Sequence, residues 1–242
     1  MKKFSPSKIA FLHLVPGFCL TIGILIVNYL LPPNIVPNFL IFIICCICIL
    51  APVEIGIIKY YKRNEESKKL IDLHEDKEKR NLKQTLILSL ISIFWAILVF
   101  TVFGSVVNTY IKETFFAWFP NELNLEQFAK ISQSYSETIL KTTYFSGLLV
   151  IGMIILIVEE VYFRGFLLAR MGKGKYTVPF IESVLFAVYH FLSPWMIPIR
   201  IIAIFPMTFF VLQKKNIWIG IVTHVFLNIV GDYILVIPII FN

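Results

Sequence analysis

Two adjacent glutamates, Glu159 and Glu160, lie with Arg164 in the sequence LIVEEVYFRGF, at the end of a long apolar stretch. An ionised side chain at the centre of a membrane helix costs roughly 2.5–3.5 kcal/mol on insertion scales. Three such groups therefore need partners or a function. On a helix, Glu160 and Arg164 are four residues apart and can pair, whereas Glu159 points about 100° away. We expect Glu160 and Arg164 to form a structural ion pair and Glu159 to face a cavity.

More polar groups follow in later apolar stretches. His190 ends the sequence FAVYH, and His224 and Asn228 lie four residues apart in HVFLN. At about 1.5 Å per residue, His190 and Asn228 lie at similar depths, roughly 18 and 17 Å along their helices. A desolvated carboxylate is a usable general base. Imidazole and carboxamide groups can bind a metal or stabilise an oxyanion. The pattern predicts activation of water for hydrolysis.

Two versions of this chemistry remain open. Glu159, His190, His224 and Asn228 could together hold a catalytic Zn²⁺ with water in the open position. A glutamate mechanism without a metal is the alternative. The sequence contains no GxSxG or HExxH motif, and no cysteine lies among these polar residues.

The surrounding sequence is that of a membrane protein. Of its 242 residues, 58% are hydrophobic and 15% are charged, with a mean hydropathy of +0.81. Soluble domains carry about 25% charged residues, and several apolar stretches here approach the roughly 20 residues of a spanning helix. The sequence predicts an all-α, polytopic membrane helix bundle. We attribute the net charge of +7 to cytoplasmic loops rather than to nucleic-acid binding.

Seven transmembrane helices are predicted, with an eighth only if the last one breaks near Gly231–Asp232. Lys and Arg concentrate in the N-terminus and alternate loops, which predicts a multi-pass protein of the cell membrane with a cytoplasmic N-terminus and an external C-terminus. The predicted spans are Ile9–Leu31, Ile35–Ile58, Thr85–Val107, Thr143–Leu168, Val178–Leu192, Trp195–Leu212 and Ile217–Ile240. The fourth could instead cover about Leu148–Arg170.

The chain is predicted to form one integrated domain with two regions. Residues 1–84 form a two-helix region that ends in the charged cytoplasmic linker Lys59–Gln84, and residues 85–242 form the helix bundle with the polar centre. The linker mixes both signs of charge, and we expect a solvated connector. Contact with anionic lipid is the alternative.

Other polar residues near lipid receive structural interpretations. Glu54 lies near the cytoplasmic end of its span, and we expect it to snorkel toward water. Glu182 is expected to reach the cytoplasmic interface, and Arg200 and Asp232 to lie near the outer one.

Three motifs resemble one known family. EEVYFR fits an EExxxR pattern, FAVYH an FxxxH pattern and HVFLN an HxxxN pattern, in that order on late helices. They resemble the CPBP family of CAAX prenyl proteases and bacteriocin-processing or immunity (Abi) proteins, over about Ile139 to Asp232. The first two spans and the linker carry no matching motif.

The resemblance implies an intramembrane endopeptidase. Glu159 would activate water with help from His190, while His224 and Asn228 would bind a metal or stabilise the oxyanion. Glu160 and Arg164 would support them. The expected partners are membrane lipid and a membrane-associated or lipidated protein or peptide substrate, without nucleic acid; the oligomeric state is not predicted. One alternative is a non-catalytic scaffold or bacteriocin-immunity protein on the same fold, and another is a transporter with an intramembrane acidic site.

Overall fold

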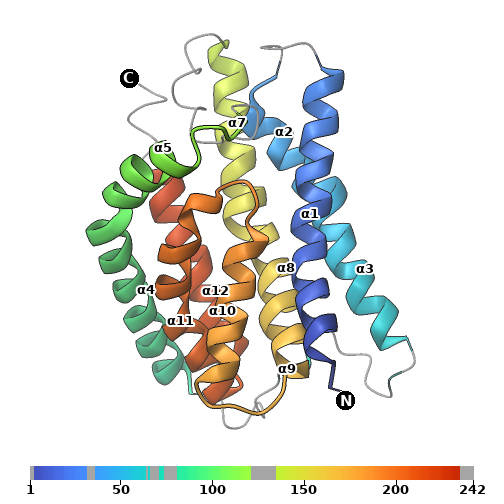
Figure 1. The fold of residues 1–242 in the computed structure, drawn as a ribbon, viewed down its shortest axis with the longest axis vertical. Helices are drawn as coiled ribbons and strands as arrows, with labels where there is room; N and C mark the ends of the chain where they lie inside the picture. Colours follow the sequence, from blue (N-terminus) through green and yellow to red (C-terminus); the bar gives the residue numbers. More distant parts are fainter. Residues whose placement is uncertain are drawn as a thin grey trace.

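A computed structural model describes residues 3–31, 36–63, 65, 71–73, 81–120 and 135–234 of the protein, and these form helices and connecting turns without strands (Figure 1). Several helices continue into one another through π-helical turns, as in α7–α8–α9. The helices are α1 Pro6–Leu30, α2 Asn38–Cys45, α3 Ala51–Lys62, α4 Leu82–Ser105, α5 Lys112–Phe115, α7 Glu137–Leu149, α8 Leu156–Glu160, α9 Leu168–Arg170, α10 Thr177–Tyr189, α11 Ile197–Lys214 and α12 Ile217–Asn228.

Five helical segments of the described chain are long and apolar enough to cross a membrane. They are Pro6–Leu30, Asn38–Lys62, Leu82–Ser105, Glu137–Arg170 and Pro194–Lys214. The predicted membrane helix bundle is therefore present, but the count of seven spans is not confirmed. The other two predicted spans correspond to the shorter apolar helices Thr177–Tyr189 and Ile217–Gly231. The predicted end of the last span, at Ile240, lies outside the described residues.

Helix α10 is short because it ends at Tyr189, before the predicted boundary at Leu192. Its 13 residues span about 20 Å, compared with about 30 Å for the hydrocarbon core of a bilayer. The chain then turns and enters α11 through the 3₁₀ turn Pro194–Met196. The α10–α11 hairpin consequently ends below the upper ends of α1 and α7 (Figure 1).

Capping residues explain where several helices begin. The hydroxyl of Ser136 accepts a hydrogen bond from the backbone N–H of Ile139, so the fourth predicted span begins at Glu137, well before Thr143. The side chain of Asn216 accepts from the N–H of Trp218 at 3.0 Å and starts α12. Ser and Asn are preferred at such positions because their oxygens pair with N–H groups that a helix leaves unbonded.

Helix α8 and the turn that follows it lie at the centre of the bundle, packed against α1, α3 and α12. The hydroxyl of Tyr162 donates to the backbone carbonyl of Leu12 on α1 at 2.6 Å. Gly17, one turn further along α1, lies so close to Tyr189 that a Cβ atom would overlap the Tyr189 carbonyl oxygen. The N-terminal helices are thus packed directly onto the helices that carry the motifs.

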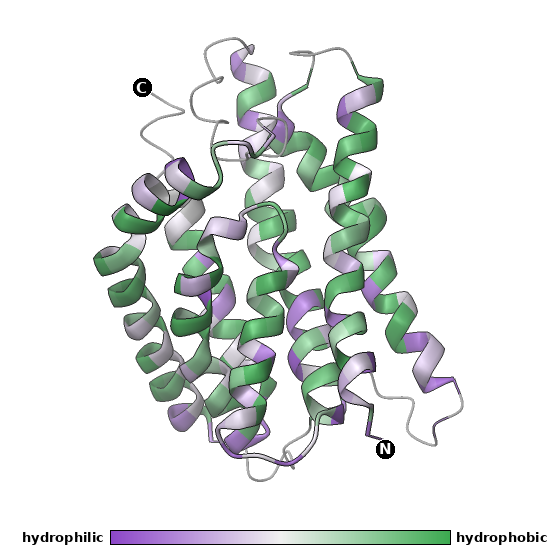
Figure 2. Ribbon diagram, viewed as in Figure 1, coloured by the Kyte–Doolittle hydropathy of each residue, from purple (hydrophilic) through white to green (hydrophobic). Residues whose placement is uncertain are grey.

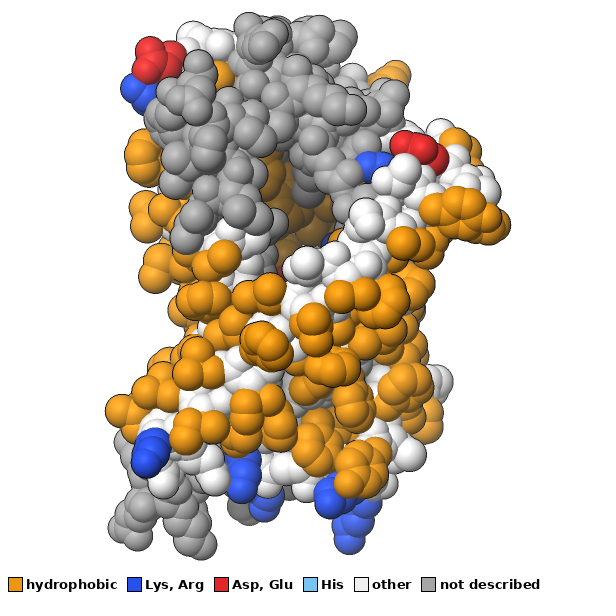
Figure 3. Space-filling view, turned by 90° about the vertical axis from the view of Figure 1, so that its left-hand side faces the viewer, with side chains coloured by type: hydrophobic (Ala, Val, Ile, Leu, Met, Phe, Trp, Pro, Cys, Tyr) orange, Lys and Arg blue, Asp and Glu red, His pale blue; other side chains and the backbone are white. Residues whose placement is uncertain are grey.

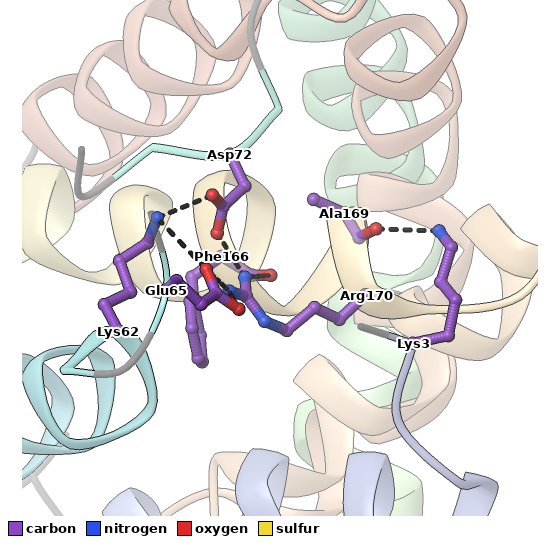
Figure 4. Close-up of polar contacts among 7 residues, drawn as sticks. All are labelled: Lys3, Lys62, Glu65, Asp72, Phe166, Ala169 and Arg170. Carbon is purple, nitrogen blue, oxygen red and sulfur yellow. Dashed lines mark hydrogen bonds and ion pairs between the residues drawn. The ribbon is translucent and has the colours of Figure 1, made fainter. Parts of the chain in front are cut away.

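The part of the charged linker that the structure describes is bound to the bundle. The backbone N–H groups of Asp72 and Leu73 donate to the carbonyl of Gly165 at 2.8 and 3.1 Å. Side chains of the linker pair with Arg170 at the end of α9 (Figure 4). The expected solvated connector is therefore wrong at Glu65 and Ile71–Leu73, where ion pairs and burial of Leu73 hold the chain in place.

The surface fits a lipid environment. Hydrophobic residues cover most of the length of the helices, whereas hydrophilic ones gather at both ends and in short stretches inside the bundle (Figure 2). A broad hydrophobic band is seen from the side, with Lys and Arg at the lower end (Figure 3). Helix α4 contributes exposed apolar side chains such as Phe94 and Leu90.

Candidate functional site in the helix bundle

Glu159 lies on α8 and is almost enclosed, with 6% of its surface exposed. Its Oε1 accepts a hydrogen bond of 2.7 Å from the phenol of Tyr189, which lies at the end of α10. Tyr189 itself is held by Gly17 on one side and stacks edge-on against Phe163 on another. One oxygen of Glu159 is therefore fixed, which leaves Oε2 as the oxygen that can meet a water molecule.

Glu160 faces a different neighbour. Its Oε1 lies 3.1 Å from Nη1 of Arg164, so the predicted ion pair is present and completely buried. The same oxygen lies 2.9 Å from Nδ1 of His224 on α12. Gly220, one turn before His224, allows this approach, because a Cβ atom there would overlap Oε2 of Glu160. Glu160 therefore orients His224 in addition to neutralising Arg164.

Arg164 has a second carboxylate partner that the sequence interpretation missed. Its Nε lies 3.2 Å from Oε1 of Glu182 on α10, and the hydroxyl of Thr208 donates to the other oxygen of Glu182 at 3.0 Å. The guanidinium also covers the ring of Phe186, 3.9 Å from its centroid. The expectation that Glu182 reaches the interface is wrong, because its side chain is fully buried in this ion pair.

The two histidines are held through the same ring nitrogen. Nδ1 of His190 lies 2.8 Å from the carbonyl oxygen of Phe186, one turn earlier in α10. A carbonyl can only accept, so Nδ1 carries the proton and Nε2 is the acceptor in the neutral ring. Nδ1 of His224 faces the carboxylate of Glu160, which fixes that ring in the same way. Both histidines therefore present Nε2 for chemistry.

Asn228 is positioned by its own helix. Its Nδ2 donates to the carbonyl of His224 at 3.1 Å, and the side chain is partly buried. An amide nitrogen carries two hydrogens, so the second can donate to another group. Nearby, Arg200 bonds the carbonyl and hydroxyl of Ser193 at 3.1 and 2.7 Å, in the turn after His190. The side chain of Asp232 lies outside the described residues.

The structure groups these side chains around two aromatic rings. The ring of Phe186 lies 4.8 Å from that of His190 and 5.7 Å from that of His224. Tyr189 contacts both His190, at 4.8 Å between rings, and the carboxylate of Glu159. Among the described residues, no direct hydrogen bond joins Glu159 to either histidine.

The predicted ligands of a metal ion are Glu159, His190, His224 and Asn228. Within the described part of the chain, no three His, Cys, Asp or Glu side chains gather closely enough to hold a metal ion. Nδ1 of His224 and Oε1 of Glu159 are each engaged with another side chain, which leaves Nε2 and Oε2 as their remaining donor atoms. Zinc stays a prediction from the sequence.

Two further buried residues of this region were missed or misjudged. Tyr189 carries the hydrogen bond to Glu159, and the signal for it was a phenol beside His190 in an apolar helix, where a buried hydroxyl needs a partner. Glu54 was expected to snorkel toward water; this is wrong, because Glu54 is completely buried on α3.

Comparison with known proteins adds one finding. A family model described as type II CAAX prenyl endopeptidase Rce1-like matches residues 141–230. This segment is Rce1-like. The resemblance inferred from the three motifs is thereby confirmed, and the matched segment contains Glu159, His190, His224 and Asn228. No curated protein and no solved structure matches the chain.

The Rce1-like segment has a limited extent. It includes α8 to α12, and it excludes α1 to α5 and the linker. The family is one of proteases, and the apolar helices make the chain a multi-pass membrane protein. The helices outside the segment nevertheless contact its central residues, through Leu12 and Gly17.

Proposed function

We propose that the protein is an intramembrane endopeptidase of the CAAX-protease type. It hydrolyses a peptide bond of a membrane-associated or lipidated protein or peptide. The observation that carries this proposal is the buried Glu159, fixed by Tyr189 through one oxygen only, within the Rce1-like segment. A nearly enclosed carboxylate with one unengaged oxygen is suited to take a proton from water.

The side chains divide the reaction between them. Oε2 of Glu159 accepts a proton from water while Nε2 of His190 orients that water, and the resulting hydroxide attacks the carbonyl carbon of the scissile bond. Glu159 then returns the proton to the leaving amine. Water and the peptide are thus converted to an acid and an amine, with no proton gained or lost overall.

Negative charge develops on the carbonyl oxygen during the attack. The unengaged amide hydrogen of Asn228 can donate to that oxygen. His224 is oriented by the carboxylate of Glu160 against its Nδ1, so that its Nε2 faces away from Glu160. Arg164 holds Glu160 in place for this purpose.

The substitution Glu159→Gln tests the proposal. It keeps the shape of the side chain and the bond from Tyr189 but removes the base, so cleavage should fall by at least about 100-fold. The measurement is a proteome comparison of cells that produce the wild-type or the variant protein at equal levels, searching for peptide products lost in the variant.

Glu137→Gln is the matched control. Glu137 lies on the same helical segment, but 77% of its side chain is exposed and it pairs with Lys141, so this variant should leave every product in place. If the Glu159 variant also leaves all products in place, the protein is not a protease of this kind. A scaffold or immunity protein would instead keep its cellular phenotype in both variants.

A further inference from the structure

Helix α3 and the turn before it present a buried stripe toward the centre of the bundle. Every fourth residue of this segment is at most 3% exposed. The spacing of four keeps these side chains on nearly one face of a helix. The stripe consists of Cys46, Leu50, Glu54, Ile58 and Lys62. Glu54, at its middle, is therefore aimed into the bundle, and its burial is a consequence of helix geometry.

The facing surface is the one that carries Glu159. Leu50 and Ile58, one turn to either side of Glu54, belong to the same buried cluster as Ile155 and Tyr162. Ile155 and Tyr162 lie about one turn to either side of Glu159, and α3 packs directly against α8. The two glutamates therefore occupy matching positions on the two facing helices.

Electrostatics agree with this placement. Glu54 lies close enough to Glu159 to interact with it electrostatically, and it interacts in the same way with Tyr189, the hydrogen-bond partner of Glu159. Glu54 is 0% exposed and Glu159 is 6% exposed. Glu54 is thus the more deeply enclosed of the two carboxyl groups.

The burial of Glu54 at this position is energetically unfavourable. Neither of its carboxylate oxygens has a hydrogen-bond partner among the described residues. Burying a polar group without a partner costs about 1–3 kcal/mol, and more for a charged one. An ionised carboxylate without a cation or hydrogen-bond donor is far more costly to bury than the neutral acid, so Glu54 is expected to be neutral. A leucine would fit the stripe at lower cost, so stability does not account for a glutamate here.

We propose that Glu54 is a positioning residue for Glu159, acting as a neutral acid from the N-terminal half of the chain. This inference rests on the proposed protease function. As a neutral acid, Glu54 offers one hydrogen-bond donor to the enclosed side of Glu159, directly or through a water molecule. The donor fixes the rotation of the Glu159 carboxylate. Because Glu54 is neutral, the single negative charge of the pair stays on Glu159, which acts as the base.

The test separates stability from activity. Glu54→Leu removes the donor and the buried polar group together. We expect the midpoint of thermal unfolding in detergent to stay the same or rise, while the turnover number falls by about 10- to 100-fold, because a displaced catalytic group loses rate in that range. Turnover is measured on the substrate whose product disappears with Glu159→Gln.

Glu54→Gln is the rescuing variant and Leu50→Met the packing control. The amide of Gln keeps a donor of nearly the same shape, so its turnover number should stay within about threefold of the wild type, with KM unchanged. Leu50→Met changes a stripe residue one turn away without touching a polar group, and conservative apolar exchanges of this kind cost less than about 1.5 kcal/mol. It should retain full turnover.

Three outcomes overturn the inference. Full turnover in Glu54→Leu would show that the carboxyl group is not needed. Equal loss in Glu54→Leu and Glu54→Gln would show that a neutral donor is not what Glu54 supplies. Loss confined to folded yield, with normal turnover per folded molecule, would make Glu54 a structural residue. A Glu159→Gln protein that still cleaves would instead refute the protease proposal itself.

Discussion

Two buried arginines on one continuous helical segment, Arg164 and Arg170, have similar surroundings but different structural roles. Each is 0% exposed, each pairs with two carboxylates, and each lies 3.9 Å over the centroid of a phenylalanine ring. The rings are those of Phe186 and Phe166, respectively.

The partners of the two arginines differ in origin and in exposure. Arg164 pairs with Glu160 and Glu182, whose side chains are 0% exposed and which come from the Rce1-like segment. Arg170 pairs with Asp72 and Glu65 of the linker, whose side chains are 9% and 24% exposed (Figure 4). The first cluster continues to His224 and so orients the site; the second continues to Lys62 and fastens the linker.

The same arrangement, one buried arginine between two carboxylates, can thus contribute different amounts to the free energy of unfolding. Breaking a buried ion pair is costly because the remaining charge has no access to water. Where the partner can reach solvent, most of that cost disappears. Equivalent substitutions in the two clusters should therefore give unequal results, and the difference measures how much burial contributes.

Arg164→Met should have the largest effect. It leaves Glu160 and Glu182 without their cation inside the bundle, which destabilises by about 3–5 kcal/mol for a broken buried pair. The folded yield in detergent and the midpoint of thermal unfolding should both drop sharply. Arg164→Lys keeps the charge but not the two-sided geometry of the guanidinium group. This variant should be more stable than Arg164→Met but should still lose cleavage activity. Normal stability in Arg164→Met would contradict the comparison.

Arg170→Met should have a moderate effect. Asp72 keeps Lys62 as a partner, and Glu65 can turn toward water, so the loss should be about 1.5–3 kcal/mol, as for hydrogen bonds to charged groups. Limited proteolysis should cut the linker faster than in the wild type. Cleavage of substrate per folded molecule should stay within about twofold. A loss of activity equal to that of Arg164→Lys would show that the linker cluster also orients the site.

Glu65→Gln should have the smallest effect. Glu65 is the more exposed partner of Arg170, and partly exposed pairs contribute about 0–1 kcal/mol. We expect a change in the midpoint of thermal unfolding close to the error of measurement, and one that shrinks further at high salt. Asp72→Asn should cost more, because the side chain of Asp72 is less exposed than that of Glu65, 9% against 24%, and lies closer to Lys62, at 2.6 Å against 3.8 Å. A larger loss of stability in Glu65→Gln than in Asp72→Asn would mean that side-chain exposure does not determine the strength of these ion pairs.

The sequence predicted what depends on local spacing. The pair Glu160–Arg164 was found because positions i and i+4 share a helix face. The apolar stretches identified the membrane helices for the same kind of reason, and the ordered motifs identified the family segment.

The sequence did not predict what depends on contacts between helices. Glu182, Tyr189 and Glu54 acquire their partners or neighbours from other helices, which spacing along the chain cannot reveal. The early end of α10 was also missed. The residues up to Leu192 are apolar enough to continue a helix, and the nearest break signal, Pro194, follows four residues after His190.

The hydrogen bond from Tyr162 to Leu12 has a consequence for the order of assembly. Its partners are 150 residues apart in the chain. At about 5–20 residues per second of synthesis, Leu12 is made roughly 8–30 s before Tyr162. The contacts of α3, which carries Glu54, with α8 also form only after α8 has been synthesised. The contacts that join the N-terminal helices to α8 and the turn after it can therefore form only after about two thirds of the chain has been made.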